Sequence, residues 1–310
     1  PSPIITMKSF ALLSLVLYFA SNFLVSSMES SSPPSSNRKL FIATNWKCSI
    51  ESSSDADKLV GSMNDEWSKL DSSIKDSVEL SVHPPYVFLD RVRRGLDPSI
   101  AVGSQNVFDA AFPNKGNTAA TTTKMLSELG CRWILLGHSD RRNNLGETDD
   151  LIAEKAALAI REGLGIVLTV GEKREQRENG ETLAVLEKQL GTVAAKIPDD
   201  EDTWNRVALA YEPVWAVGEG ATPCEAAEAQ RIHSALREYI RKNVSAKAAD
   251  ACRITYTGSV NPDNAEAYAG RSEVDGFVVG RAGLDAVKLT SIIKTLVGTK
   301  NSALETKSAL

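Results

Sequence analysis

Short apolar runs recur along the chain from Lys39 onward, and stretches with helical spacing follow most of them. The runs that predict strands cover 40–44, 78–82, 100–104, 133–136, 166–170, 207–211, 254–256 and 277–279. The clearest helical pattern covers 150–162, where apolar residues fall on one face and Gly163 ends the pattern. Strands that are apolar throughout and alternate with helices predict a parallel sheet covered on both faces.

About eight such strand–helix units favour an α/β fold in which a closed parallel (β/α)8 barrel holds residues 38–300. The runner-up is an open, doubly wound sheet. No GxGxxG motif follows a strand, which counts against that alternative. A capping box with proline at the first helical position, Thr222-Pro223-Cys224-Glu225, predicts a helix start.

Residues 1–37 differ from the rest of the chain. Met7-Lys8-Ser9 precedes an apolar run over 10–25, and the small pair Ser26-Ser27 follows it, which is the layout of a secretory signal peptide. Polar residues interrupt the run and it is short for a spanning helix, so no stable membrane anchor is expected. Met28 is a second start that would remove the leader, and 29–37 is a Ser/Pro-rich linker expected to be disordered. Residues 301–310 are expected to form a flexible tail.

Composition narrows the function classes. The 310 residues are 42% hydrophobic and 24% charged, as in an ordinary globular protein. The net charge of -5 gives no sign of the basic surface that binds nucleic acid. The four cysteines show neither CxxC spacing nor a histidine cluster, which argues against a metal site or a redox pair. Free thiols are expected.

Glu212 ends an apolar strand, and Pro213 stops that strand at once. The residues that follow, up to Ala221, are apolar and then rich in glycine, a composition suited to a loop that covers a site. We call residues 213–221 the lid. The pattern predicts a carboxylate base under a lid, although a lone Glu-Pro pair is more often an ordinary surface feature.

Other chemistry-bearing residues also follow predicted strands. In a barrel of parallel strands the carboxyl ends of the strands carry the chemistry, so these residues should meet. Taken singly, a lysine or a histidine there would more often be solvated or structural, but an amine, an imidazole and a carboxylate together form a specific constellation. The residues at these ends are Asn45, Lys47, His138, Asp140, Ser259, Gly280 and Arg281.

The motifs at these positions resemble the triosephosphate isomerase family from about Phe41 to Val297. They are NWKC at 45–48, the Gln105-Asn106 pair, GHSDRR at 137–142, VGEKREQRENGET at 170–182, AYEPVWAVG at 210–218, and GSV and DGFVVG at 258–260 and 275–280. The resemblance implies a TIM barrel that interconverts glyceraldehyde 3-phosphate and dihydroxyacetone phosphate in glycolysis and gluconeogenesis. It implies a small phosphorylated triose as substrate and neither a metal nor an organic cofactor.

The resemblance also assigns roles. It makes Glu212 the base and His138 a neutral electrophile, an arrangement known for this family, with Lys47 supplying charge and Asn45 an amide donor. It places the carboxylate of Asp140 near Lys47 and Asn45. Backbone amides near Gly218, Ser259, Gly280 and Arg281 would hold the phosphate.

Several positions depart from the family pattern. Asp140 stands where glutamate is usual, which shortens the carboxylate by one methylene. The lid carries Glu219 and Ala221 where threonine and lysine are usual, and Thr257 and Arg281 each replace a glycine. An arginine side chain would crowd a position where glycine permits close approach or positive φ. These departures leave two alternatives: a catalytically reduced homologue that acts as a phosphate-ligand-binding or regulatory module, and, less favoured, another sugar-phosphate enzyme on the same barrel.

The resemblance further implies a homodimer whose third loop inserts beside the neighbouring active site. The corresponding stretch is 112–122, which lacks the usual apolar ring and the carboxylate that would meet Arg141 across the interface. A weakened dimer is therefore expected. The family usually works in the cytosol or in plastids, whereas the leader favours secretion or entry into an organelle.

Overall fold

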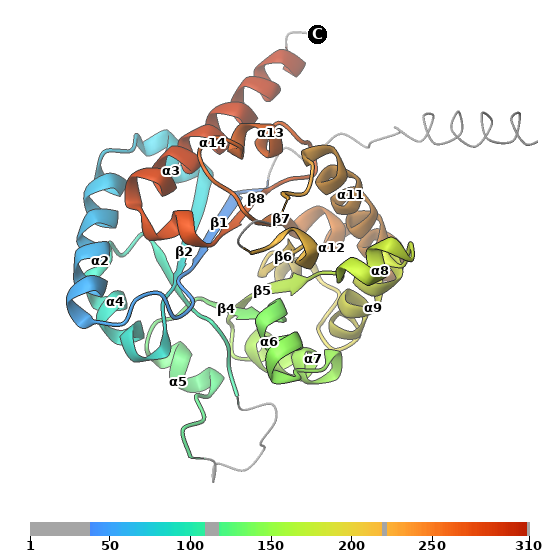
Figure 1. Ribbon diagram of the computed structural model, residues 1–310, viewed down its shortest axis with the longest axis horizontal. Coiled ribbons are helices and arrows are strands. Elements are labelled where there is room, and N and C mark those ends of the chain that lie inside the picture. Colours follow the sequence, from blue (N-terminus) through green and yellow to red (C-terminus); the bar gives the residue numbers. More distant parts are fainter. Residues whose placement is uncertain (1–37, 109–117, 219–221, 309–310) are drawn as a thin grey trace, which may run out of the picture. The chain divides into compact units, whose positions relative to one another are not determined.

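The computed structural model describes residues 38–108, 118–218 and 222–308. Eight parallel strands close into a barrel in chain order, with β8 beside β1 (Figure 1). The strands are β1 Leu40–Asn45, β2 Val78–His83, β3 Ala101–Ser104, β4 Trp133–Leu136, β5 Gly165–Val170, β6 Val207–Tyr211, β7 Arg253–Gly258 and β8 Gly276–Val279. The predicted (β/α)8 barrel is confirmed.

Helices surround the ring of strands (Figure 1). The α-helices are α2 Ser53–Ser68, α3 Ser72–Ser77, α4 Leu89–Gly95, α5 Thr123–Glu128, α6 Ser139–Leu145, α7 Asp149–Arg161, α8 Arg174–Glu178, α9 Thr182–Ala194, α10 Glu201–Trp204, α11 Ala226–Asn243, α12 Ala246–Ala251, α13 Ala265–Ala269 and α14 Ala286–Ser308. Short 3-10 helices are η1 Tyr86–Phe88, η3 Val214–Ala216 and η4 Arg281–Leu284.

Helix α7 shows how the sequence sets an element. Thr148 caps its first turn by accepting a hydrogen bond from the amide of Leu151, at 3.2 Å, and Asp149 and Asp150 lie near the positive end of the helix dipole. Gly163, with a φ of 78°, then turns the chain toward β5. The buried face that includes Ile152 and Ala156 packs against the barrel, as the apolar spacing predicted.

The predicted helix start at Thr222 is wrong. Helix α11 begins at Ala226, with Glu225 as its N-cap. The reason is tertiary: Cys224 is buried, and its carbonyl oxygen accepts a hydrogen bond from the hydroxyl of Tyr268. That contact holds the chain outside the helix for the residues of the predicted first turn.

The apolar interior has two parts. A small cluster from the strands fills the barrel and includes Phe41, Trp133, Leu135 and Val167. A much larger cluster lies between the strands and the helices. Side chains that alternate along each strand supply both, which is why the strands read as continuous apolar runs.

The ends of the chain differ in what the structure describes. The leader and linker, residues 1–37, lie outside the described residues, so their assignment stays a prediction. Residues 301–308, expected in a flexible tail, continue helix α14 to Ser308, and its last turns extend past the neighbouring helices (Figure 1). Within the described ranges, no helix is both long and apolar enough to cross a membrane.

Candidate active site

A cavity of about 480 Å³ opens at the carboxyl ends of the strands. Eight of the nine predicted site residues line it, namely Asn45, Lys47, His138, Glu212, Gly218, Ser259, Gly280 and Arg281. The ninth, Asp140, reaches the cavity through its ion pair with Lys47. The described residues contain no group of three or more His, Cys, Asp or Glu side chains placed to hold a metal ion.

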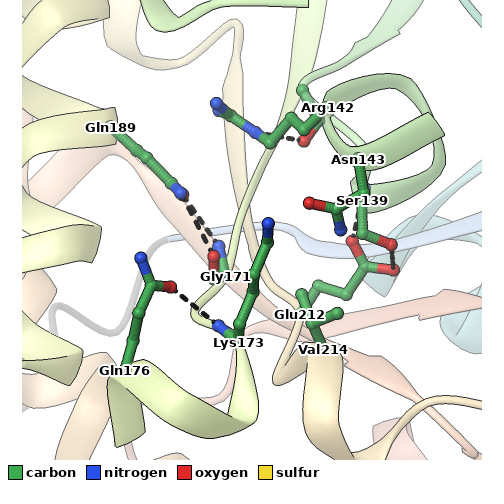
Figure 2. Close-up of a pocket in the computed structure, with 10 residues that line it drawn as sticks. Ser139, Arg142, Asn143, Gly171, Lys173, Gln176, Gln189, Glu212 and Val214 are labelled. Atoms are coloured by element: carbon green, nitrogen blue, oxygen red, sulfur yellow. Dashed lines mark hydrogen bonds between the residues drawn. The ribbon is translucent and has the colours of Figure 1, made fainter. Parts of the chain in front are cut away.

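Glu212 follows β6 directly, and its side chain is only 3% exposed. Two groups of Ser139 hold its carboxylate: the amide donates to Oε2 and the hydroxyl donates to Oε1, both at 2.9 Å (Figure 2). A second cavity, of about 140 Å³, lies against the same carboxylate, and Asn143 and Lys173 are among the residues that line it (Figure 2). Glu212 is therefore a buried carboxylate with a defined resting position.

His138 lies beside Glu212 as the N-cap of helix α6. Its Nδ1 accepts the backbone N–H of Asp140 at 3.1 Å, so this nitrogen carries no proton and the ring proton belongs on Nε2. The Asp140 carboxylate lies 3.4 Å from the same nitrogen, but the amide contact is shorter and Lys47 already donates to that carboxylate. Nε2 lies 3.3 Å from Oε1 of Glu212. A neutral imidazole thus presents an N–H beside the carboxylate.

Lys47 lies two residues after the end of β1, and its backbone is strained, with a φ of 48°. Its amide donates to Oδ1 of Asn45 at 3.0 Å, and its carbonyl accepts from Nε2 of Gln105 at 2.9 Å. Gln105 also donates to the carbonyl of His83, at 3.0 Å, which ties β2 to the same turn. These bonds hold the lysine over the cavity mouth and leave the amide NH2 of Asn45 as its remaining donor group.

Asp140 reaches Lys47 although its side chain is one methylene shorter than the usual glutamate. Its Oδ2 lies 2.9 Å from Nζ of Lys47. Partial burial opposes ionisation of this carboxyl, but the hydrogen bond and charge of Lys47 outweigh it, so the pKa of Asp140 lies below its usual value. Lys47 and Asp140 therefore form an ion pair at the edge of the cavity.

The opposite end of the cavity is formed by the turns after β7 and β8 and by Gly218. Gly218 has a φ of 117°, which only glycine adopts without strain. Arg281 is not among the described non-glycine residues with positive φ. Replacing the family's glycine by arginine therefore causes no backbone strain from a positive φ at this position. Thr257, the other replaced glycine, is buried and donates its hydroxyl to the carbonyl of Val278 at 2.9 Å.

The start of the lid is anchored firmly. The indole N–H of Trp215 donates to Oε1 of Glu172 at 2.7 Å, and the Arg177 guanidinium lies 4.1 Å from the centre of the indole ring. Burial raises the pKa of Glu172, although Trp215 and Tyr211 both donate to it. The predicted lid residues 219–221, which include Glu219 and Ala221, lie outside the described residues.

Sequence reasoning missed three positions that organise this site. Ser139 holds the carboxylate of Glu212, and its place inside the GHSDRR segment was the available signal. Glu172 anchors the lid, and its place inside the VGEKREQRENGET segment was the available signal. Gly171 permits close approach of two strands: a Cβ there would lie 1.9 Å from the carbonyl oxygen of Glu212.

The Gly171 contact predicts that Gly171→Ala displaces the backbone of Glu212. Gln189 holds Gly171 from the other side by two hydrogen bonds, so the added methyl has no room to move away. We expect a loss of about 1–3 kcal/mol in the free energy of unfolding and a fall in kcat of about 10²-fold from the misplaced carboxylate. Urea unfolding and steady-state kinetics measure both effects.

The matched control is Gly61→Ala in helix α2, where a Cβ meets nothing within 4 Å. This change should stabilise the protein by about 0.4–1 kcal/mol and leave kcat unchanged. Equal effects of the two substitutions would show that the close approach at Gly171 is unimportant.

Comparison with known proteins agrees with this geometry. The profile of the triosephosphate isomerase family matches residues 40–296. A cytosolic triosephosphate isomerase of Oryza sativa subsp. japonica is 41% identical over 251 residues, which are 80% of this chain and 93% of that protein. A chloroplastic triosephosphate isomerase of Arabidopsis thaliana is 38% identical over 269 residues, 86% of this chain and 80% of that protein. A triosephosphate isomerase of Neurospora crassa is 37% identical over 248 residues, 80% of this chain and 94% of that protein. The chain therefore belongs to the triosephosphate isomerase family.

Proposed function

We propose that this chain interconverts glyceraldehyde 3-phosphate and dihydroxyacetone phosphate through an enediolate. The observation that carries the proposal is the group of Glu212, His138 and Lys47 in one cavity, with a carboxylate oxygen 3.3 Å from an imidazole Nε2. Relatives at 37–41% identity are named triosephosphate isomerase, which supports the same reaction.

The reaction needs a base that removes a proton from the carbon beside the carbonyl. Glu212 supplies it, and its carboxylate must first leave the two hydrogen bonds from Ser139. His138 then donates its Nε2 hydrogen bond to the developing enediolate oxygen, and Lys47 stabilises the same negative charge. Asp140 orients Lys47 through the ion pair.

The phosphate binds at the far end of the cavity, beside Gly218, Ser259, Gly280 and Arg281. Backbone amides of such turns bind anions well, because their dipoles point at the ligand. The lid covers the bound substrate and excludes water, which keeps the enediolate from losing its phosphate. The firm attachment of Trp215 gives the lid a fixed starting point.

Steady-state interconversion of the two triose phosphates by the full chain tests this proposal. The matched control is Glu212→Gln, which removes the proton acceptor and keeps the shape of the side chain. Turnover that the control abolishes would support the isomerase. A folded protein that binds phosphate ligands without turnover would instead support a catalytically reduced homologue, and turnover of a different phosphosugar would support another enzyme on this barrel.

We propose a homodimer of reduced strength. Arg141, which would meet a partner carboxylate in the family, donates instead to Glu147 of its own chain at 2.6 Å. In the sequence of the third loop, Asn117 stands where the family pattern has an apolar ring and Ala120 where it has a carboxylate, whereas Thr118 is kept. Residues 109–117 lie outside the described residues. Loss of an aromatic anchor can cost ~1 kcal/mol or more of association.

The expected result is a dimer that dissociates measurably on dilution in analytical ultracentrifugation. Asn117→Phe is the direct test, because it restores a ring at the position where the family pattern has one and should tighten the dimer. A dimer that stays intact at nanomolar concentration would contradict the proposal.

The relatives include cytosolic and chloroplastic proteins. We propose the cytosol as the site of action for a product that starts at Met28. A product that starts at Met7 carries the signal-peptide-like leader and would enter the secretory route or an organelle.

A further inference from the structure

Arg281 is a cation of the cavity wall with no acidic partner among the described residues. It is exposed and begins η4, directly after Gly280, at the predicted phosphate end of the cavity. Of the side chains given above as lining this cavity, only those of Lys47 and Arg281 are cationic. The two cations come from the ends of different strands, β1 and β8.

The charge of Lys47 is already balanced. Asp140 lies 2.9 Å from its ammonium, and Glu212 adds a second carboxylate to the same cavity. Without Arg281, these side chains sum to one negative charge, which would oppose the entry of a phosphate dianion. With Arg281, they sum to zero. Arg281 therefore supplies the charge that makes the cavity compatible with a phosphorylated substrate.

The chemistry of the side chain fits the same task. A guanidinium presents its N–H groups as a planar fork that matches two phosphate oxygens, and such charge-assisted pairs are about twice as strong as neutral hydrogen bonds. Arg281 makes no ion pair or hydrogen bond with its side chain in the described part of the protein, so no existing bond has to break first. The absence of positive φ at this position leaves the arginine free of backbone strain.

We propose that the guanidinium of Arg281 binds the phosphate group of the substrate, beside the backbone amides of the same turn. The inference rests on the proposed triose-phosphate function for the identity of the substrate. It makes Arg281 a determinant of specificity for phosphorylated over unphosphorylated sugars.

The test compares Arg281→Gln and Arg281→Gly in the full chain on two substrates. With glyceraldehyde 3-phosphate, kcat/KM should fall about 10–100-fold for both variants, mainly through KM. With glyceraldehyde, which has no phosphate, kcat/KM should change less than about twofold, because the lost contact is to the phosphate. Arg271→Gln is the matched control, since it removes one charge from an exposed arginine that does not line the cavity.

Calorimetric titration with inorganic phosphate gives a second readout that does not depend on turnover. The wild-type chain should bind phosphate, and Arg281→Gln should weaken that binding by a similar factor while Arg271→Gln leaves it unchanged. If the wild type binds phosphate but shows no turnover, the proposed function fails and the role of Arg281 is still decided by this titration. Unchanged or improved use of glyceraldehyde 3-phosphate by Arg281→Gly would overturn the inference and show that the side chain crowds the site. Failure of the wild type to bind phosphate at millimolar concentration would also overturn it.

Discussion

Glu212→Gln is expected to lower kcat for triose-phosphate isomerisation by about 10²–10⁴-fold, the usual contribution of a positioned general base. An amide cannot accept the substrate proton, and the described cavity wall holds no second carboxylate in the position of Glu212. Steady-state kinetics in both directions measures the effect. KM should change little, because the proposed phosphate contacts lie beside Gly218, Ser259, Gly280 and Arg281, away from this carboxylate.

The geometry makes glutamine a close structural match. Its amide oxygen can accept the N–H of Ser139 in place of Oε2, and its NH2 group can donate to the hydroxyl of Ser139, which now accepts. The same NH2 group replaces Oε1, which lies 3.3 Å from Nε2 of His138, so two N–H donors then face each other there. The variant should therefore fold with a thermal midpoint slightly below that of the wild type and bind inorganic phosphate normally. If the variant keeps more than a tenth of the wild-type kcat, Glu212 is not the base and Asp140 becomes the next carboxylate to test.

Arg237→Met is expected to lower the free energy of unfolding by about 3–5 kcal/mol, the usual cost of removing one partner from a buried ion pair. Arg237 lies in helix α11 with its side chain 7% exposed. Its guanidinium donates to Asp275 at 2.6 Å, to Glu273, and to the carbonyls of Ala249 and Cys252 at 2.6 and 2.8 Å. Methionine leaves all four acceptors without this donor. Urea unfolding followed by circular dichroism measures the loss.

Arg94→Met is the control, because its ion pair with Asp90 is exposed and such pairs contribute about 0–1 kcal/mol. The response to acid gives an independent check. Burial opposes ionisation of Asp275, but the charges of Arg237 and Arg38 outweigh it and hold its pKa below the usual value. A depressed carboxyl pKa stabilises the folded state above the ordinary aspartate pKa, and this stabilisation is lost as the pH falls through the folded pKa. The difference in stability between wild type and Arg237→Met should therefore shrink in acid, and a constant difference would contradict the ion-pair explanation.

The sequence alone identified the barrel, because its signals are local and repeated. Each strand is a continuous apolar run and each connecting helix has its own amphipathic spacing, so neighbouring residues carry the information. Strand β7 shows where the local apolar pattern no longer predicts the structure. The apolar run predicted a start at Ile254, but the strand begins at Arg253. The guanidinium of Arg253 is buried, pairs with Glu79 at 2.7 Å and lies 5.0 Å from the ring centres of Phe41 and Trp133. No neighbouring residue reveals those partners.

The residues of the candidate site could be predicted from the sequence, but the contacts between them could not. A proline directly after a strand, glycine-punctuated loops and the family motifs predicted which residues stand at the strand ends, and eight of nine line one cavity. The contacts between them are tertiary: Ser139 holds Glu212 across 73 residues, and Asp140 reaches Lys47 across 93. Spacing along the chain contains no information on such distances, since barrel closure brings these strand ends together. The sequence by itself therefore determined the fold and the set of site residues. Only the tertiary structure decided which carboxylate pairs with Lys47, where Glu212 rests, and that Arg281 lines the cavity without an acidic partner, because these depend on groups that meet only after the barrel has closed.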